Sequence, residues 1–323
     1  MSAAATRLIR AEGELLEQVL DLTHPLWGEG LTPDAYATWN RAQQQTPWGR
    51  RHLERVALVD DNGRLLSTAK RYRFDARLDE RPVRVCGIGA VFTPPDLRGN
   101  GYATAIVERL LDDARADGVE FGALFSAVGA GLYERLGFTP LDLDEVTVGV
   151  TRKGGSPAML VRAGDERDLP GIAAMHDVRS AGARFALRRD VPLIHYALAR
   201  KRLLAGLGPS GLRQLEFFVA EEGASAVAYV VLSVNQHGWT LEEAGDRDPA
   251  AARLGAILQV LLAREPSNDV PLIRAWWPRA FAVPPQLQLT ARSTPHEPLM
   301  MRPLADIAVP AAADVFYWRS DQF

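Results

Sequence analysis

The segment from residue 83 to residue 125 constrains the fold more than any other part of this sequence. An apolar run over 83–91 breaks at a double proline, and a glycine-containing turn at 98–101 (Arg-Gly-Asn-Gly) then opens an amphipathic stretch. Apolar residues recur there at helical spacing, and a second apolar run follows over 119–125. The sequence therefore predicts a strand, a turn, a helix and a strand in this order.

The turn has the chemistry of an anion site. Gly99 and Gly101 can adopt backbone angles closed to other residues, so successive N–H groups can point at one anion with the helix dipole behind them. Arg98 adds a charged donor at the rim. A nucleotide P-loop would need Lys and Ser or Thr where Tyr102 and Ala103 stand, and a dinucleotide fingerprint would need a third glycine. An ordinary strand-to-helix turn is the alternative.

The pattern Arg-Gly-x-Gly-x-Ala, after a strand that ends in proline, resembles the pyrophosphate-binding motif of the GNAT N-acetyltransferases, which hold acetyl-CoA there. Residues 129–138 (GAGLYERLGF) resemble the family's later LYxRLGF segment. The resemblance is residue-specific from about residue 55 to residue 138. It implies that Tyr133 is the general acid and that backbone contacts to the acetyl group come from Val91, Phe92 and Thr93. It also implies a pyrophosphate site formed by Arg98, Gly99, Asn100, Gly101, Tyr102 and Ala103.

The length of 323 residues exceeds what one hydrophobic core usually serves, so we expect two domains. The Asn62-Gly63 step predicts a hairpin ahead of the strand at 83–91, which makes the expected fold an α/β (α+β) mixed sheet. A glycine- and proline-containing linker at 152–157 divides the chain into domains at 1–151 and 157–323.

The second part echoes the first, because residues 160–163 (LVRA) resemble residues 8–11 (LIRA). Its loop at 244–249 lacks the glycine pattern and carries Asp246 and Asp248, which oppose anion binding. We therefore expect tandem GNAT folds with a degenerate second copy that has lost any CoA site. The chain resembles the enhanced-intracellular-survival acetyltransferases in this respect, and residues 91–103 also resemble fungal lysine N-acetyltransferases.

Composition excludes several classes. Hydrophobic residues make up 47% and charged residues 24%, so the chain is not disordered, and a net charge of -3 gives no nucleic-acid footprint. Cys86 is the single cysteine, and the histidines are widely spaced, so we expect no disulfide and no metal site. The sequence shows no signal peptide and no apolar run of membrane length, which predicts a soluble cytoplasmic protein without a membrane partner. A homo-oligomer remains open.

The general base is less defined. His52 and Glu54 precede a predicted strand and are candidates. The tail at 316–323 is unusually aromatic, and in the enhanced-intracellular-survival relatives the terminal carboxylate is the base, which implies that role for Phe323. The alternative is a last strand in the sheet of the second domain. Trp276 and Trp277 are expected to pack the second core or to cover the acceptor cleft.

The predicted function is direct, acetyl-CoA-dependent N-acetylation of a small primary amine such as free lysine, a polyamine or an aminoglycoside-like compound. Attack requires a neutral amine, a polarised thioester and a proton for the thiolate. A splayed strand at residues 91–93 would offer N–H groups to the thioester oxygen. The alternative is a non-catalytic module that senses acyl-CoA or binds another ligand.

Overall fold

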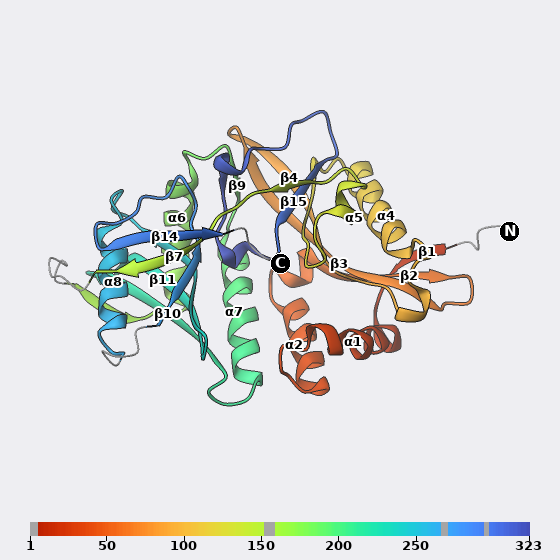
Figure 1. Ribbon diagram of the computed structural model, residues 1–323, viewed down its shortest axis with the longest axis horizontal. Helices are drawn as coiled ribbons and strands as arrows, with labels where there is room; N and C mark the ends of the chain where they lie inside the picture. Colours follow the sequence, from red (N-terminus) through yellow and green to blue (C-terminus); the bar gives the residue numbers. More distant parts are fainter. Residues whose placement is uncertain (1–5, 152–158, 266–270, 294–296) are drawn as a thin grey trace.

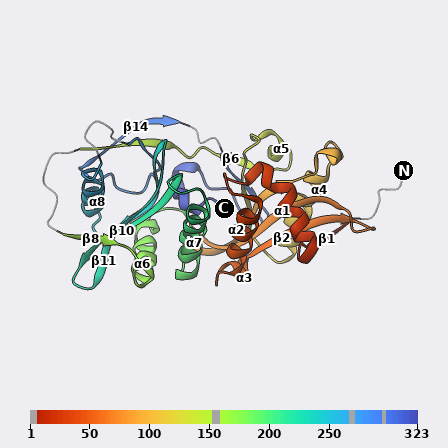
Figure 2. The ribbon, with the colours of Figure 1, turned by 90° about the horizontal axis from the view of Figure 1, so that it is seen from below.

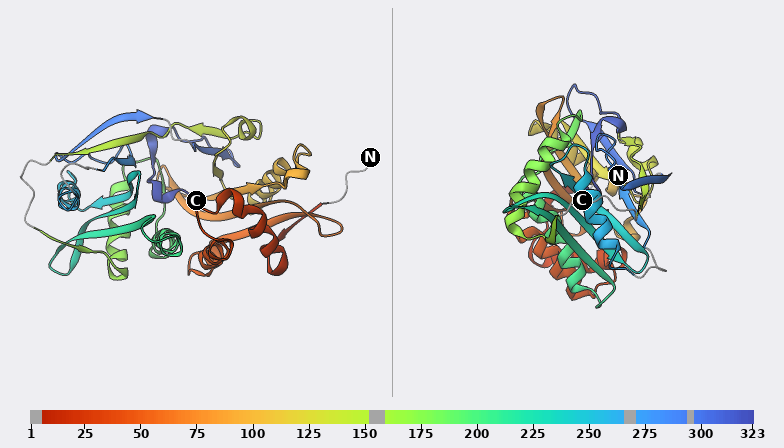
Figure 3. Two further views of the ribbon diagram at one scale, coloured as in Figure 1. Left: turned by 60° about the horizontal axis from the view of Figure 1, so that its bottom comes forward. Right: turned by 90° about the vertical axis from the view of Figure 1, so that its left-hand side faces the viewer.

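The computed structural model describes residues 6–151, 159–265, 271–293 and 297–323. It has two bodies, each built on its own mixed sheet, which lie side by side in Figure 1. In Figure 3 the two bodies extend to opposite sides of the C-terminus. The fold class expected from the sequence, two mixed α/β sheets in tandem, is confirmed.

The first sheet contains the predicted hairpin and the strands around the glycine turn. Its order is β1 (Thr6–Arg10), β2 (Leu53–Asp60), β3 (Leu65–Leu78), β4 (Arg81–Phe92), β5 (Phe121–Phe125), β15 (Leu299–Pro303) and β6 (Thr139–Leu141). Strands β4 and β5 are parallel, and the other neighbours in this order are antiparallel. The far end of β3 also pairs with β9 (Phe185–Leu187), which in turn pairs with β16 (Val315–Phe316).

Helices of the first body bring the turn and the walls of the site into place. The connection from β1 to β2 contains α1 (Gly13–Trp27), α2 (Pro33–Gln45) and α3 (Gly49–His52); η1 (Pro95–Leu97) and α4 (Tyr102–Ala116) follow β4, and α5 (Gly131–Glu134) follows β5. Helix α2 begins at Thr32, whose Oγ1 accepts a hydrogen bond from Ala35 N at 3.3 Å. Helix α4 buries Ile106 and Leu110 with Ile88 and Leu124 of the sheet, which fixes its N-terminus at the end of β4.

The second sheet repeats the strand-helix-strand unit of the first. Its order is β14 (Leu287–Ser293), β7 (Glu145–Val150), β13 (Ile273–Trp276), β12 (Gly238–Asp246), β11 (Ser225–Asn235), β10 (Arg213–Glu222) and β8 (Leu160–Ala163). Its helices are η2 (Glu166–Asp168), α6 (Leu169–Ser180), α7 (Val191–Leu207) and α8 (Ala252–Leu262). Strands β12 and β13 are parallel and α8 joins them, as α4 joins β4 and β5. The echo between residues 8–11 and 160–163 also has a counterpart, because β1 and β8 are both edge strands.

The two bodies exchange strands. Strand β7, from the first half of the sequence, lies between β13 and β14 of the second sheet, and β15, from near the end, lies between β5 and β6 of the first. The linker expected at 152–157 lies outside the described residues. A single cut in the sequence therefore does not separate the two sheets.

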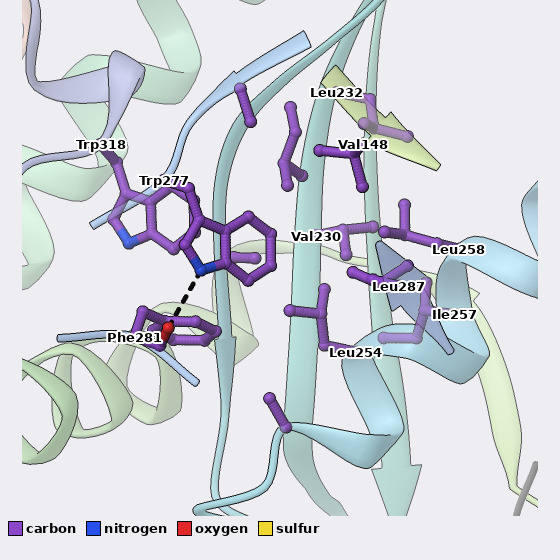
Figure 4. Packing of buried hydrophobic residues seen from close by; sticks show 14 of the residues in the cluster. Val148, Val230, Leu232, Leu254, Ile257, Leu258, Trp277, Phe281, Leu287 and Trp318 are labelled. Carbon is purple, nitrogen blue, oxygen red and sulfur yellow. Dashed lines mark hydrogen bonds between the residues drawn. The ribbon is translucent and has the colours of Figure 1, made fainter. Parts of the chain in front are cut away.

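The last residues of the sequence join the two bodies through η3 (Ala312–Asp314), β16 and η4 (Arg319–Asp321). Phe316 and Trp318 belong to the core of the second body, where Trp318 packs edge-on against Trp277 (Figure 4). Val315 and Tyr317, which alternate with them, belong to a core of the first body. A last strand in the second sheet, the alternative for this tail, is wrong because β16 pairs with β9 of the first sheet.

Candidate active site

Strands β4 and β5 separate partway along β4. Their pairing runs from Val85↔Phe121 to Ile88↔Leu124, and β4 then continues to its end without a β5 partner. The β3–β4 ladder shifts register in the same stretch, where Ala90 has a φ of +48°. The backbone of residues 89–91 is therefore free of ladder bonds on the β5 side.

The three residues expected beside the acetyl group have different surroundings. Val91 lines the cavity next to this opening. The Phe92 carbonyl accepts a hydrogen bond from Ser67 Oγ at 2.9 Å, and Thr93 Oγ1 donates to the same hydroxyl oxygen at 3.2 Å. Phe92 and Thr93 are both hydrogen-bonded to Ser67 of β3. The main chain that could contact an acetyl group therefore begins earlier, at Gly89.

The glycine turn presents open backbone at the start of α4. Gly99 has a φ of +81° and Gly101 a φ of +80°, and a Cβ placed on either would meet no atom within 4 Å. The Asn100 side chain donates to the Leu97 carbonyl at 3.0 Å, which closes the turn, while Arg98 is exposed. The first N–H groups of a helix lack intrahelical acceptors, so this turn can hold a pyrophosphate through its backbone. Tyr102 and Ala103, the first residues of α4, supply two of these groups.

A cavity of about 610 Å³ lies between the two bodies. Its walls come from α2, β2, β3 and β4 of the first body, from α7 and β13 of the second, and from the tail. Val91, Tyr133 and Phe323 all line it, so the structure brings together the opened strand and both predicted catalytic residues. The glycine turn at residues 98–101 is not part of its wall.

Tyr133 is placed by the short helix α5, which follows β5. Its side chain is buried and packs edge-on against Phe138, with ring centroids 6.0 Å apart. Burial raises the pKa of the Tyr133 hydroxyl, so the phenol is protonated at neutral pH. It can therefore donate a proton or a hydrogen bond into the cavity.

Phe323, the last residue of the sequence, lies against β4 at the opening. Its ring packs on Tyr72 and Phe74, each with centroids 5.0 Å away. Gly87 of β4 allows this approach, since a Cβ there would lie 2.8 Å from the Phe323 ring, and the main-chain oxygen of Phe323 lies beside Gly89. Figures 1 and 2 both place the C-terminus between α2 and α7.

The other two base candidates lie away from this cavity. His52 stacks on Trp48 at a centroid distance of 5.0 Å, and burial lowers the pKa of its imidazole. Burial acts to raise the pKa of Glu54, but hydrogen bonds from Arg73 and Arg71 outweigh it and leave the carboxyl below its ordinary value. Neither side chain lines the cavity.

Several residues of the cavity wall were not expected from the sequence. Arg55 of β2 and Lys70 of β3 line it, as does Arg200 of α7, which donates to the Gln322 carbonyl at 2.5 Å. The sequence signal for Arg55 and Lys70 was a charged residue within a strand, and the alternation of a strand alone does not decide whether such a residue faces a cavity or solvent. Trp276 also lines the cavity, stacked on Phe125 with centroids 5.6 Å apart. Both expected roles for the tryptophan pair therefore occur, because its neighbour Trp277 lies in the second core.

In the second body, the turn before α8 corresponds to the glycine turn, and the side chain of Asp246 occupies it. Asp246 is fully buried, and its carboxylate accepts hydrogen bonds from Asp248 N at 2.8 Å, Arg253 N at 2.9 Å and Leu254 N at 3.0 Å. These are the N–H groups at the start of α8 and in the loop before it. The Asp246 carboxylate therefore takes up three donors that an external anion would otherwise use, whereas no side chain fills the turn before α4.

Within the described ranges, no three His, Cys, Asp or Glu side chains are grouped so that they could hold a metal ion. No helix in this part of the chain combines the length and apolar character needed to cross a bilayer. Cys86 is buried in the core of the first body, and burial raises the pKa of its thiol to about 12.

Comparison with known proteins supports the assignment of the first body. Residues 8–141 match the acetyltransferase (GNAT) domain family. No curated protein matches the chain by sequence. The family match confirms the expected GNAT acetyltransferase domain and supports acyl transfer from an acyl-CoA as its chemistry.

Solved structures share the fold over nearly the whole chain. A probable N-acyltransferase from Enterococcus faecalis V583 aligns with a TM-score of 0.67 and 14% identity, covering 93% of this chain and 73% of that one. Eis1 from Mycobacterium abscessus aligns with a TM-score of 0.57 and 14% identity over 93% and 74%. N-myristoyltransferase from Saccharomyces cerevisiae, solved with myristoyl-CoA, aligns with a TM-score of 0.55 and 8% identity over 94% and 85%.

The family match and the fold agree with the site. The matched region contains the glycine turn, the opening between β4 and β5, and Tyr133. Residues 8–141 thus match the GNAT acetyltransferase domain family, within a chain that has a tandem GNAT-like fold of two mixed sheets.

Proposed function

We propose that this protein is an acetyl-CoA-dependent N-acetyltransferase that transfers the acetyl group directly to a small primary amine bound in the interbody cavity. The observation that carries the proposal is the opening between β4 and β5, which faces the same cavity as Tyr133 and Phe323. The open turn before α4 follows on the same strand and provides the anion site that CoA requires.

Each step of the transfer has a group in place. Backbone N–H groups at residues 99–103 bind the pyrophosphate, with Arg98 at the rim. Main-chain N–H groups near Gly89 and Val91 stabilise the negative charge that develops on the thioester oxygen. The amine nitrogen bonds to the acetyl carbon, the carbon–sulfur bond breaks, and Tyr133 protonates the departing thiolate.

The attacking nitrogen must also lose a proton. The α-carboxylate of Phe323 is our proposed acceptor of that proton, because Phe323 lines the cavity while His52 and Glu54 do not. Solvent then returns a proton to Tyr133, so the amine gains an acetyl group and CoA leaves as the thiol.

Purified protein should be incubated with acetyl-CoA and a panel of primary amines while free thiol is followed with a chromogenic disulfide. We expect thiol release that depends on an amine and yields the N-acetyl product in equal amount. Tight acetyl-CoA binding with no amine-dependent release across the panel would instead favour the acyl-CoA-sensing alternative.

A further inference from the structure

Building on the proposed function, we propose that the acceptor amine also carries an anionic group, a carboxylate or a phosphate, which Arg55 and Lys70 bind inside the cavity. The two residues are directly paired across β2 and β3. Both line the cavity whose wall also contains Val91 and Tyr133. A ligand held there would therefore reach the acetyl-transfer centre with its other end.

Arg55 has an unused donor. Its side chain is 1% exposed, and Nη1 donates to the Ala90 carbonyl at 3.3 Å. Nη2 is buried and has no hydrogen-bond partner among the described residues. A buried charged donor without an acceptor is costly, which indicates that a ligand atom completes the site.

The Lys70 ammonium also lacks a negatively charged partner. Its Nζ lies 3.5 Å from Gln43 Oε1 and 5.7 Å from the centroid of the Trp39 ring. Within the described ranges, no carboxylate lies within 4.0 Å of the Lys70 or Arg55 nitrogens. Burial, with Arg55 and Arg200 nearby, lowers the pKa of the Lys70 ammonium well below its ordinary value. An anion beside it would restore the proton.

The acidic side chains of the cavity are already engaged, in contrast to this cationic pair. Glu29 pairs with Arg213 at 3.4 Å and Glu145 with Arg319 at 3.3 Å, while Glu297 accepts a hydrogen bond from Gln322. The remaining lysine of the wall, Lys201, pairs with Glu242 at 2.8 Å. The remaining charged groups of the wall are the Phe323 α-carboxylate, which we propose as the base, and the side chains of Arg55, Lys70 and Arg200. Basic groups are therefore in excess, which disfavours an acceptor that is cationic at both ends.

The first test compares acceptors of equal length. Aminoalkyl carboxylates, aminoalkyl phosphates and diamines with two to six methylenes should be assayed by thiol release. We expect the better anionic series to exceed the matched diamines in kcat/KM by about 10- to 100-fold, the range for one hydrogen bond to a charged group. The ranking of carboxylate against phosphate identifies the anion. Diamines that match or exceed both anionic series would overturn the proposal.

Variants locate the anion. Lys70→Met and Arg55→Gln should each bring the anionic acceptors down to the level of the diamines while leaving the acetyl-CoA Kd within about twofold. Arg41→Gln, on the exposed face of α2, is the matched loss of one positive charge and should keep the preference. Equal losses for anionic acceptors and diamines would show that these residues serve the fold or CoA instead. Circular dichroism shows whether each variant is folded. If Arg55→Gln does not fold, the comparison of acceptors is made with Lys70→Met alone.

A binding measurement separates this proposal from the proposed function because it needs no turnover. Titration calorimetry of the N-acetylated aminoalkyl acids in buffers of different ionisation enthalpy should show net proton uptake on binding at pH 8. Lys70→Met should abolish that uptake. Proton-linked binding without any amine-dependent thiol release would refute the transferase and retain the anion site. Turnover without proton uptake or anion preference would refute the anion site alone.

Discussion

The N-termini of α4 and α8 occupy corresponding places in the two bodies, each after one strand of a parallel pair and before the other. In front of α4 stand Gly99 and Gly101, with free space where side chains would be. In front of α8 the Asp246 carboxylate accepts three backbone hydrogen bonds. Both helices have the same dipole, so the residue types ahead of each helix, glycines before α4 and Asp246 at the end of β12, determine whether the donors are open to a ligand or satisfied within the fold.

The two bodies also differ after the second strand of each parallel pair. After β5 the chain forms α5, which places Tyr133 at the cavity. After β13 it continues to Trp277, which packs in the second core with Phe281 and Trp318 (Figure 4). The first body thus contains both the open turn and the tyrosine that we propose as anion site and proton donor, whereas the second contributes cavity wall and core.

The largest effect should come from making the first turn resemble the second. Gly101→Asp places a carboxylate among the N–H groups of α4, and we expect the acetyl-CoA Kd to rise at least about 100-fold because like charges meet there. Titration calorimetry gives this value and the stoichiometry, which we expect to be one per chain in the unchanged protein.

Gly211→Asp is the matched control, because Gly211 also has a left-handed φ, +78°, and open space around it. It should leave the affinity unchanged. Two equivalent CoA sites in the unchanged protein, or normal affinity in Gly101→Asp, would break the comparison.

The next effect concerns Tyr133 of the first body, which we propose as the proton donor. Tyr133→Phe should lower kcat by about 10²–10⁴ with little change in the acetyl-CoA Kd, since the ring still packs while the proton is lost. Steady-state kinetics and calorimetry on the same preparation provide both numbers. A kcat equal to that of the unchanged protein would show that Tyr133 is not the general acid and only packs in the core.

Local patterns were enough to predict much of the first body. The Asn62-Gly63 hairpin, the break after β4 and the amphipathic α4 all depend on neighbours in sequence, and the structure has each of them. The docked aromatic tail followed from composition, because so many rings at a chain end favour burial. The sequence also showed Asp246 as a negative charge ahead of the second helix, where it opposes the binding of an anion.

Long-range pairing was not predictable in the same way. Strands β7 and β15 have five or six residues each and nothing in their sequences specifies a sheet, so their exchange between bodies emerges only from the assembled fold. The cationic wall was missed for a related reason. Arg55 and Lys70 lie in ordinary strands, and the approach of α2, α7 and the tail buries Arg55 and half-buries Lys70.

A smaller effect is expected at the tail. Converting the Phe323 α-carboxylate to an amide by protein ligation, after intact mass has established Phe323 as the last residue of the purified chain, should lower kcat about 10- to 100-fold. The midpoint of thermal unfolding should stay unchanged, because the ring contacts with Tyr72 and Phe74 remain. Equal kcat values for the acid and the amide would exclude this carboxylate as the base and leave a water chain.

The smallest effect tests the filled turn itself. Asp246→Ala removes the acceptor of three backbone donors and should lower the free energy of unfolding by about 2 kcal/mol, measured by urea denaturation, with kcat unchanged. Asp248→Ala removes a single such bond, to Ala250 N, and should cost less. No loss in Asp246→Ala would mean that solvent satisfies those donors equally well.

The same side chain gives a pH dependence with a definite sign. Burial raises the pKa of Asp246 and outweighs the lowering by its backbone hydrogen bonds, so the folded protein holds this proton to higher pH than the unfolded chain does. Its contribution to stability is thus fully present below the ordinary carboxyl pKa and is lost as pH rises through the raised value. Asp246→Asn, which cannot ionise, should lack that decline in urea denaturation series from pH 3 to pH 7. If the stability of Asp246→Asn declined with pH as in the unchanged protein, other buried groups would be its cause. The ionised Asp246 carboxylate would then carry no desolvation cost at the N-terminus of α8.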